Sequence, residues 1–305
     1  MMMTTRRQLL ATGAGALAGV CLAQDKDEDS PGWIDAHVHV WTPKTKKYPN
    51  AKGRDRKGLR ASFTPEELFS ECRPHGVSRI VLIQMSFYGH DNSYMLDVMD
   101  RHKGLFGGVA IVDETAPDLA KRMRALRRRG VRGFRVYANA KNASAWEKSN
   151  DMKKMWREAA KTHQSICCLA DPDALPSITR LCKEHPETSV VIDHFARIGM
   201  RGKIRQEQLD QLLRLSSFKR VAVKTSAFYA LGAKAPPYDD LADMIRQLRD
   251  SYGADRLMWA SDCPFQVEDK HTYKASIALV RDRLDFLSAA EKTAMLRGTA
   301  ERIFF

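Results

Sequence analysis

Residues 33–41 read WIDAHVHVW, an apolar run rich in β-branched and aromatic residues that carries two histidines one residue apart. Such a short run predicts a buried β-strand. Side chains two residues apart on a strand project to the same face, so His37 and His39 should point their imidazoles in one direction. A lone histidine on a strand is more often a core residue, but a pair separated by apolar Val38 indicates a functional site.

Seven further runs of the same kind follow, at residues 78–86, 105–113, 131–138, 164–171, 189–196, 220–228 and 256–264. Amphipathic stretches between them predict helices, and two more predicted helices, near 272–287 and 289–303, close the chain. Eight strands, each followed by a helix, predict a single (β/α)8 TIM barrel over residues 33–305. A doubly wound α/β sheet is the alternative, but no Gly-rich phosphate loop follows the first strand to support it.

The first residues do not resemble the rest of the chain. TTRRQLL contains Arg6 and Arg7 and is followed by a short Gly/Ala-rich apolar stretch that ends at Ala23. This pattern predicts a twin-arginine signal peptide over residues 1–24, a polar linker over 25–32 and export to the periplasm, with no membrane span after cleavage. An uncleaved anchor or a frayed N-terminus is the alternative.

The net charge of the chain indicates which class of molecule it binds. The chain has 305 residues, with 50 Lys and Arg against 37 Asp and Glu, which gives a formal net charge of +13. This excess favours a small anionic substrate. A nucleic-acid partner would require interleaved aromatic residues or a known binding fold, and neither is evident.

The cysteines after the predicted signal peptide contain no CxxC pair, so we expect them to be buried and to pack as apolar side chains. The sequence does not indicate an oligomeric state.

Polar residues gather late in the predicted strands, which is where TIM barrels build their active sites. They include His37, His39, Arg135, Tyr137, Asp171, Asp193, His194, Lys224, Ser226, Ser261 and Asp262. We predict that Arg135, Lys224, Tyr137 and the loop residue His90 contact the substrate. Pairing with an acid inside the barrel is the alternative for Arg135 and Lys224.

Strand parity makes two further predictions. Asp193 precedes His194, so on a regular strand it should face the helices and be structural. Asp35 should share the face of His37 and act as a buried hydrogen-bonding anchor. His194 and Asp262 come from strands that can converge on the mouth where His37 and His39 point, and there the four residues could bind a metal or a polarised substrate oxygen.

Three segments resemble the amidohydrolase superfamily: IDAHVHVW its opening strand, VVIDHFARIG its strand-six segment and GADRLMWASDCPF its strand-eight segment. The resemblance is to the amidohydrolase-related branch, which includes sugar-acid lactonases, 2-pyrone-4,6-dicarboxylate lactonases and amino-carboxymuconate-semialdehyde decarboxylases, and it is nearest the lactonases. It implies a metal or carbonyl-polarising site lined by His37, His39 and His194. It also implies that Asp262 is the catalytic general base and an additional metal ligand. The implied cofactor is one divalent ion, Zn²⁺ or alternatively Mn²⁺, or no metal.

Departures from the superfamily pattern limit this interpretation. The strand-seven run VAVKTSAF contains no histidine, Leu169 lies about where many relatives have one, and strand five offers no lysine for carboxylation, so a binuclear site is not expected. The resemblance implies a hydrolase that opens a sugar-acid or dicarboxylate lactone by attack of an activated water. One alternative is a non-oxidative decarboxylase, but the decarboxylases of this branch carry a histidine in strand seven and this chain does not. The other alternative is a non-catalytic ligand-binding barrel.

Overall fold

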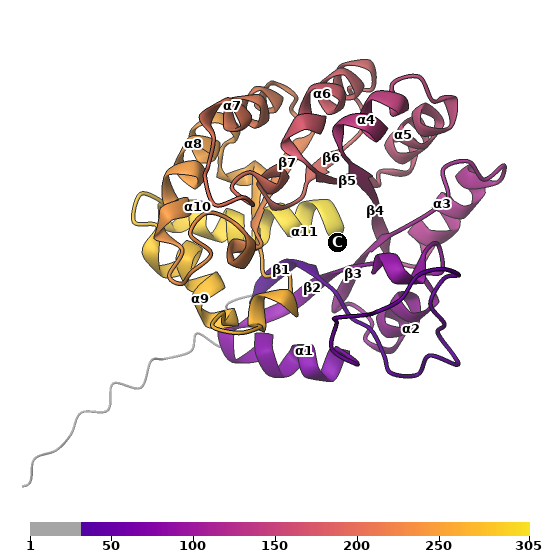
Figure 1. The fold of residues 1–305 in the computed structure, drawn as a ribbon, viewed down its shortest axis with the longest axis horizontal. Coiled ribbons are helices and arrows are strands. Elements are labelled where there is room, and N and C mark those ends of the chain that lie inside the picture. The colour runs from indigo at the N-terminus through magenta and orange to yellow at the C-terminus, as the bar shows by residue number, and fades with distance from the viewer. Residues whose placement is uncertain (1–31) are drawn as a thin grey trace, which may run out of the picture. The chain divides into compact units, whose positions relative to one another are not determined.

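Eight parallel strands pair in sequence order around the centre of the molecule (Figure 1). They are β1 (Trp33–Val38), β2 (Val77–Ile83), β3 (Phe106–Ala110), β4 (Val131–Ala138), β5 (Ser165–Ala170), β6 (Val190–Ile192), β7 (Val221–Ser226) and β8 (Leu257–Ala260). A bridge between Val38 and Cys263 joins the first and last strands, and the Asp262 amide donates to the His37 carbonyl at 2.9 Å. The computed structural model describes residues 32–305, and within them the predicted (β/α)8 barrel is confirmed.

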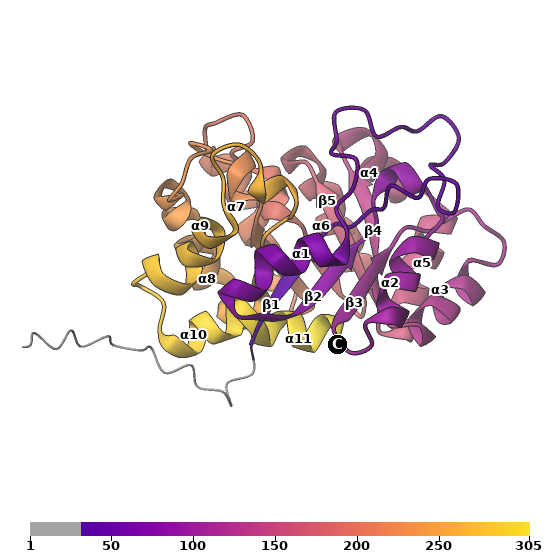
Figure 2. The same ribbon diagram turned by 90° about the horizontal axis from the view of Figure 1, so that it is seen from below.

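Helices surround the strands, and the last one lies across one end of the barrel (Figures 1 and 2). They are α1 (Pro65–Cys72), α2 (Ser93–Arg101), α3 (Leu119–Arg128), α4 (Ala140–Trp146), α5 (Asn150–Thr162), α6 (Leu175–Glu184), α7 (Gln206–Arg214), α8 (Ala242–Tyr252), α9 (Tyr273–Ala278), α10 (Ala289–Thr293) and α11 (Thr299–Phe304). Helix α4 was not predicted because its seven residues are too few to show a hydrophobic period, although Asn139 and Asn142 cap each other at its start. The first predicted C-terminal helix ends in a π-helical turn at Leu279–Arg283, and the second is interrupted by one at Ala294–Gly298.

The last helix closes the end of the barrel opposite the long loops (Figure 2). Phe304 of α11 is buried among side chains that line the barrel interior, including Val81, Val109 and Met258. Gly107 of β3 permits this approach, because a Cβ atom there would lie 2.6 Å from the Phe304 carbonyl oxygen. One end of the barrel is therefore filled, and the site must lie at the other end.

The predicted signal peptide and the linker up to Pro31 lie outside the described residues. Among residues 32–305, no helix has both the length and the apolar character needed to cross a bilayer. The five cysteines in this range are all buried and unpaired, as the sequence predicted.

Candidate active site

A bulge in β1 directs both histidines into the barrel. Asp35 pairs with Ile80 and Val38 with Leu82, so β1 advances three residues where β2 advances two. The extra residue inverts the alternation of side chains. His37 and His39 therefore point inward, as predicted. The prediction that Asp35 shares their face is wrong: Asp35 accepts a hydrogen bond from Tyr273 of α9, on the helix side. Its role as a buried anchor is confirmed, because it also accepts from the backbone N–H groups of His37 and Ser261.

A left-handed turn after β6 brings His194 to the same place. His194, Phe195, Ala196 and Arg197 all have φ between 51° and 58°. Each non-glycine residue in this conformation costs about 1–2 kcal/mol, so the surrounding structure must hold the turn in place. The prediction that Asp193 faces the helices is wrong: β6 keeps its alternation through Asp193, which points inward, and His194 reaches the mouth only because the chain turns there.

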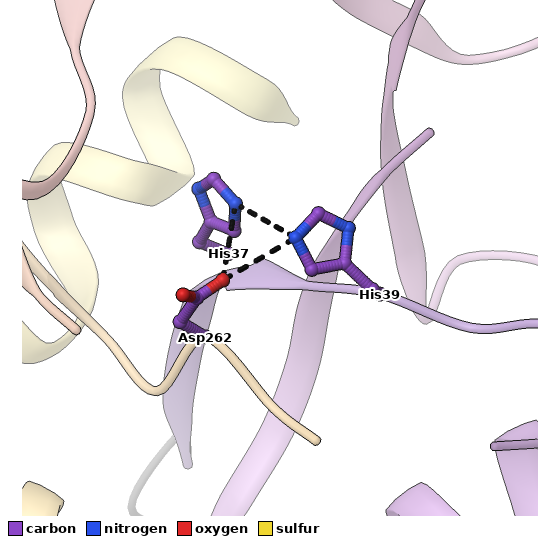
Figure 3. A group of neighbouring side chains, drawn as sticks. All are labelled: His37, His39 and Asp262. Atoms are coloured by element: carbon purple, nitrogen blue, oxygen red, sulfur yellow. Dashed lines mark hydrogen bonds and ion pairs between the residues drawn. The ribbon is translucent and has the colours of Figure 1, made fainter. Parts of the chain in front are cut away.

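Three buried side chains form a compact group at the mouth of the barrel (Figure 3). His37 Nε2 lies 3.3 Å from His39 Nε2 and 3.5 Å from Asp262 Oδ1, and His39 Nε2 lies 3.3 Å from the same oxygen. A tetrahedral ion with bonds of about 2.0–2.1 Å requires ligand atoms about 3.3–3.4 Å apart. Asp262 Oδ1 is buried and has no hydrogen-bond partner among residues 32–305. The donor set thus fits one divalent ion.

The protonation of the histidines suits this role. His39 Nδ1 lies 2.9 Å from the Ile83 carbonyl oxygen, so Nδ1 carries the ring proton and Nε2 keeps its lone pair. Burial, reinforced by the charge of Lys224, holds the pKa of His37 well below its usual value, and burial lowers the pKa of His194 to about 4. Neutral imidazoles are the form that binds metals.

His194 and Tyr229 contact the other oxygen of Asp262. His194 Nε2 lies 3.8 Å from Asp262 Oδ2, which places this imidazole beside the group of three rather than within it. The Tyr229 hydroxyl donates to Oδ2 at 2.7 Å. Burial alone would raise the pKa of Asp262, but the neighbouring imidazoles of His194, His39 and His37 hold it below its ordinary value. Tyr229 was missed from the sequence because it lies one residue beyond the predicted strand, in the short turn Phe228–Ala230.

Lys224 lies in the barrel interior, where its side chain is fully buried, and its predicted substrate contact stays a prediction. Its Nζ lies 3.1 Å from Asp193 Oδ1 and 3.1 Å from His37 Nδ1, and all three side chains are fully buried. The alternative from the sequence, pairing with an acid inside the barrel, is what the structure contains. Both members of this ion pair lie close to His37 Nδ1, on the interior side of the barrel.

A cavity of about 210 Å³ lies beside Asp262 and is lined by His39, Arg135, Leu169, His194, Arg197, Met200, Ala227, Tyr229, Ala230, Leu231, Asp262 and Phe265. Arg135 is buried, and its Nη1 lies 3.1 Å from His37 Nε2. His90 and Tyr137 do not line this cavity. They line a neighbouring hollow that also contains Arg135, so their role in substrate binding stays a prediction.

A parallel eight-stranded barrel with histidines and a carboxylate at the carboxyl ends of its strands has the architecture of a TIM-barrel enzyme. The amidohydrolase family model matches residues 34–305, so the chain belongs to the amidohydrolase family. The resemblance noted in the sequence is thereby confirmed.

Its relatives include lactone hydrolases. The 4-sulfomuconolactone hydrolase of Rhizobium radiobacter is 27% identical over 238 residues, which cover 76% of this chain and 76% of the relative. The L-fucono-1,5-lactonase of Burkholderia ambifaria is 25% identical over 236 residues, covering 76% of this chain and 80% of the relative. A solved candidate 2-pyrone-4,6-dicarboxylic acid hydrolase of Pseudomonas putida superposes with a TM-score of 0.76 at 26% identity, covering 90% of this chain and 98% of the other.

Proposed function

We propose that this protein is a lactonase that opens a cyclic ester by hydrolysis, with one divalent ion held by His37, His39 and Asp262. The observation that carries the proposal is the spacing of the three donor atoms, at 3.3–3.5 Å around a buried carboxylate oxygen. The lactone hydrolases among its relatives support the same chemistry. When bound, the ion supplies Lewis-acid polarisation of the lactone carbonyl, and Zn²⁺ suits two imidazoles and a carboxylate.

Asp262 accepts the proton of the attacking water in this proposal. Water adds to the ring carbonyl carbon, and Asp262, whose pKa is held low, is ionised and accepts the proton of the attacking water. The ring C–O bond then breaks, the proton passes to the departing ring oxygen, and the product is a hydroxy acid. Tyr229 fixes the carboxylate during these steps through its hydrogen bond to Oδ2.

His194 faces the carbonyl in this scheme. Its Nδ1 lies 2.7 Å from Ser226 Oγ. If Ser226 donates this hydrogen bond, the ring proton resides on Nε2. His194 lines the cavity, so this N–H group can donate to the carbonyl oxygen of the substrate. Binding of the ion requires one adjustment, because the hydrogen bond from Arg135 to His37 Nε2 must break to free that lone pair.

The decisive experiment is acid release from a panel of lactones, followed with a pH indicator. Asp262→Asn keeps the shape of the side chain but is not a base, so kcat should fall about 10²–10⁴-fold. Asp285→Asn, at an exposed position, is the matched control and should keep full activity. Elemental analysis should find about one metal ion per wild-type chain and less in His37→Asn. Full activity of the Asp262 variant would show that another group accepts the proton.

We also propose that the protein is exported by the twin-arginine route. Arg6, Arg7 and the apolar stretch behind them support this proposal. That route carries folded proteins, which is compatible with a site whose metal is loaded before export.

A further inference from the structure

A second hollow lies at the end of the barrel opposite the candidate active site. We call it the basal hollow, and its lining is drawn from residues 186–189, 217–222, 256 and 302–303. These residues come just before β6, β7 and β8 and from α11, the helix that closes this end (Figure 2). Its volume is about 620 Å³, compared with about 210 Å³ for the cavity beside Asp262, and no residue lines both. It is therefore a separate space, with a volume typical of small-molecule sites.

The lining of the basal hollow is rich in positive charge. Glu187 is its one carboxylate, and it is already paired with Arg220 at 2.9 Å. The other three cationic side chains belong to none of the ion pairs formed within residues 32–305: Lys219, Arg256 and Arg302. Like charges that line one space repel each other, and an anion placed among them would remove that repulsion.

Arg256 is held in a fixed orientation by main-chain carbonyl groups. Its Nε donates to the Tyr252 oxygen at 2.7 Å, and its Nη1 donates to the oxygens of Ser216 and Phe218 at 2.8 and 3.1 Å. Its Nη2 has no hydrogen-bond partner within the described chain and is accessible to solvent. This nitrogen therefore offers two N–H donors whose orientation is set before any ligand arrives.

Arg302 is tethered close to Arg256 along the chain. Its Nη2 donates to the carbonyl oxygen of Asp255, the residue before Arg256. The remaining donors of its guanidinium have no partner within residues 32–305, and the side chain is exposed. Two guanidinium groups, one from the start of β8 and one from α11, are thus available to the same anion.

The rest of the lining is mainly apolar. Phe218 and Ile303 are half-buried, so part of each side chain is open to the hollow. Ala222 also lines it, and Ala222 belongs to the layer of side chains inside the barrel, where its methyl group leaves space that a larger residue would fill. A ligand with an apolar body could bury that body here while its charged group stays with the arginines.

We infer that the basal hollow binds a small amphipathic anion, in which a phosphate or carboxylate group accepts hydrogen bonds from Arg256 and Arg302 and an apolar body packs against Phe218 and Ile303. Both head groups share the required chemistry, because their oxygens accept from a guanidinium. The ligand would contact the starts of the strands and α11 together. Its binding should therefore stabilise the closed end of the barrel.

The test measures binding by calorimetry with four probes: phenyl phosphate, phenylacetate, inorganic phosphate and the neutral 2-phenylethanol. Wild type should bind at least one of the two aromatic anions about 10-fold or more tightly than 2-phenylethanol, and phenyl phosphate about 10-fold more tightly than inorganic phosphate. The tighter aromatic anion identifies the head group, and either order supports the inference. At ten times its Kd, that anion should raise the melting temperature by about 2–4 °C.

Substitutions place the binding within the molecule. Arg302→Gln and Arg256→Lys should each weaken binding of the tighter anion about 10-fold, and Arg302 is exposed, so its replacement should not disturb folding. Arg128→Gln, at an exposed position on α3, removes the same charge elsewhere and should bind like wild type. Arg197→Gln, at the barrel mouth, should also bind like wild type.

Three results would overturn the inference. The first is equal affinity of wild type for the aromatic anions and 2-phenylethanol. The second is no binding of either anion at about 10 mM, well above the Kd expected when two charged hydrogen bonds and an apolar ring contribute. The third is binding that Arg197→Gln abolishes and Arg302→Gln retains, because the anion would then occupy the mouth. None of these results bears on lactone hydrolysis at the other end of the barrel.

Discussion

Replacing Lys224 with Met should destabilise the barrel severely, because it would leave a carboxylate in the interior without its cation. Lys224 Nζ lies 3.1 Å from Asp193 Oδ1, and both side chains are fully buried. Burial would raise the pKa of Asp193, yet the charge of Lys224 outweighs it and holds that pKa well below its ordinary value. The folded protein therefore contains an ionised aspartate that depends on this lysine.

The expected loss in the free energy of unfolding follows from removing one member of the Lys224–Asp193 ion pair. Removing one member of a buried ion pair typically costs about 3–5 kcal/mol, whereas replacing both members with neutral residues can be close to neutral. Met fills much of the volume of Lys, so the cavity term should be small. We expect Lys224→Met to lower the free energy of unfolding by about 3–5 kcal/mol, and Lys224→Met combined with Asp193→Asn to recover at least about 2 kcal/mol of it.

Urea unfolding followed by tryptophan fluorescence measures the effect, with refolding checked for reversibility. Arg122→Met is the control, because its ion pair with Asp118 is exposed and its loss should leave the urea midpoint nearly unchanged. A Lys224→Met protein within about 1 kcal/mol of wild type, or strictly additive effects in the double variant, would show that Asp193 does not depend on Lys224. The double variant should be inactive, because His37 loses its contacts with Lys224 and with the Asp193 carboxylate.

Three further changes test other parts of the molecule. Tyr229→Phe keeps the ring but removes the hydrogen bond to Asp262, the proposed general base, so kcat should fall roughly 10-fold with unchanged circular dichroism, and an unaltered kcat would remove this hydroxyl from the mechanism. Gly107→Ala should lower the urea midpoint because its Cβ would meet the backbone of α11, whereas Gly298→Ala, whose Cβ has no close contact, should not. Arg6→Lys with Arg7→Lys should retain a tagged protein in the cytoplasm, and normal periplasmic delivery on fractionation would exclude the twin-arginine route.

The barrel could be predicted from sequence because its signals are local and repeated. Each strand is a short apolar run, each connection contains a helical period, and the number and order of these units leave few topologies. The position of the site followed from a general property of the fold, since polar residues late in the runs must meet at one end. Short elements such as α4 carry no such period, and its helix is stabilised by the reciprocal cap between Asn139 and Asn142.

Side-chain direction at the strand ends could not be predicted, because the alternation of a regular strand does not continue where the chain leaves the sheet. The bulge in β1 put Asp35 and His37 on opposite faces, and the left-handed turn after β6 allowed Asp193 and His194 to point into the same space. Both irregularities are unfavourable locally, and both increase the number of polar side chains that reach the centre of the barrel. Asp193, the residue before this turn, is the inner partner of Lys224, and the turn itself supplies the imidazole beside Asp262 and, three residues later, the guanidinium of Arg197. The regular alternation of side chains predicted the fold. The site lies where that alternation is interrupted, at the bulge in β1 and at the turn after β6.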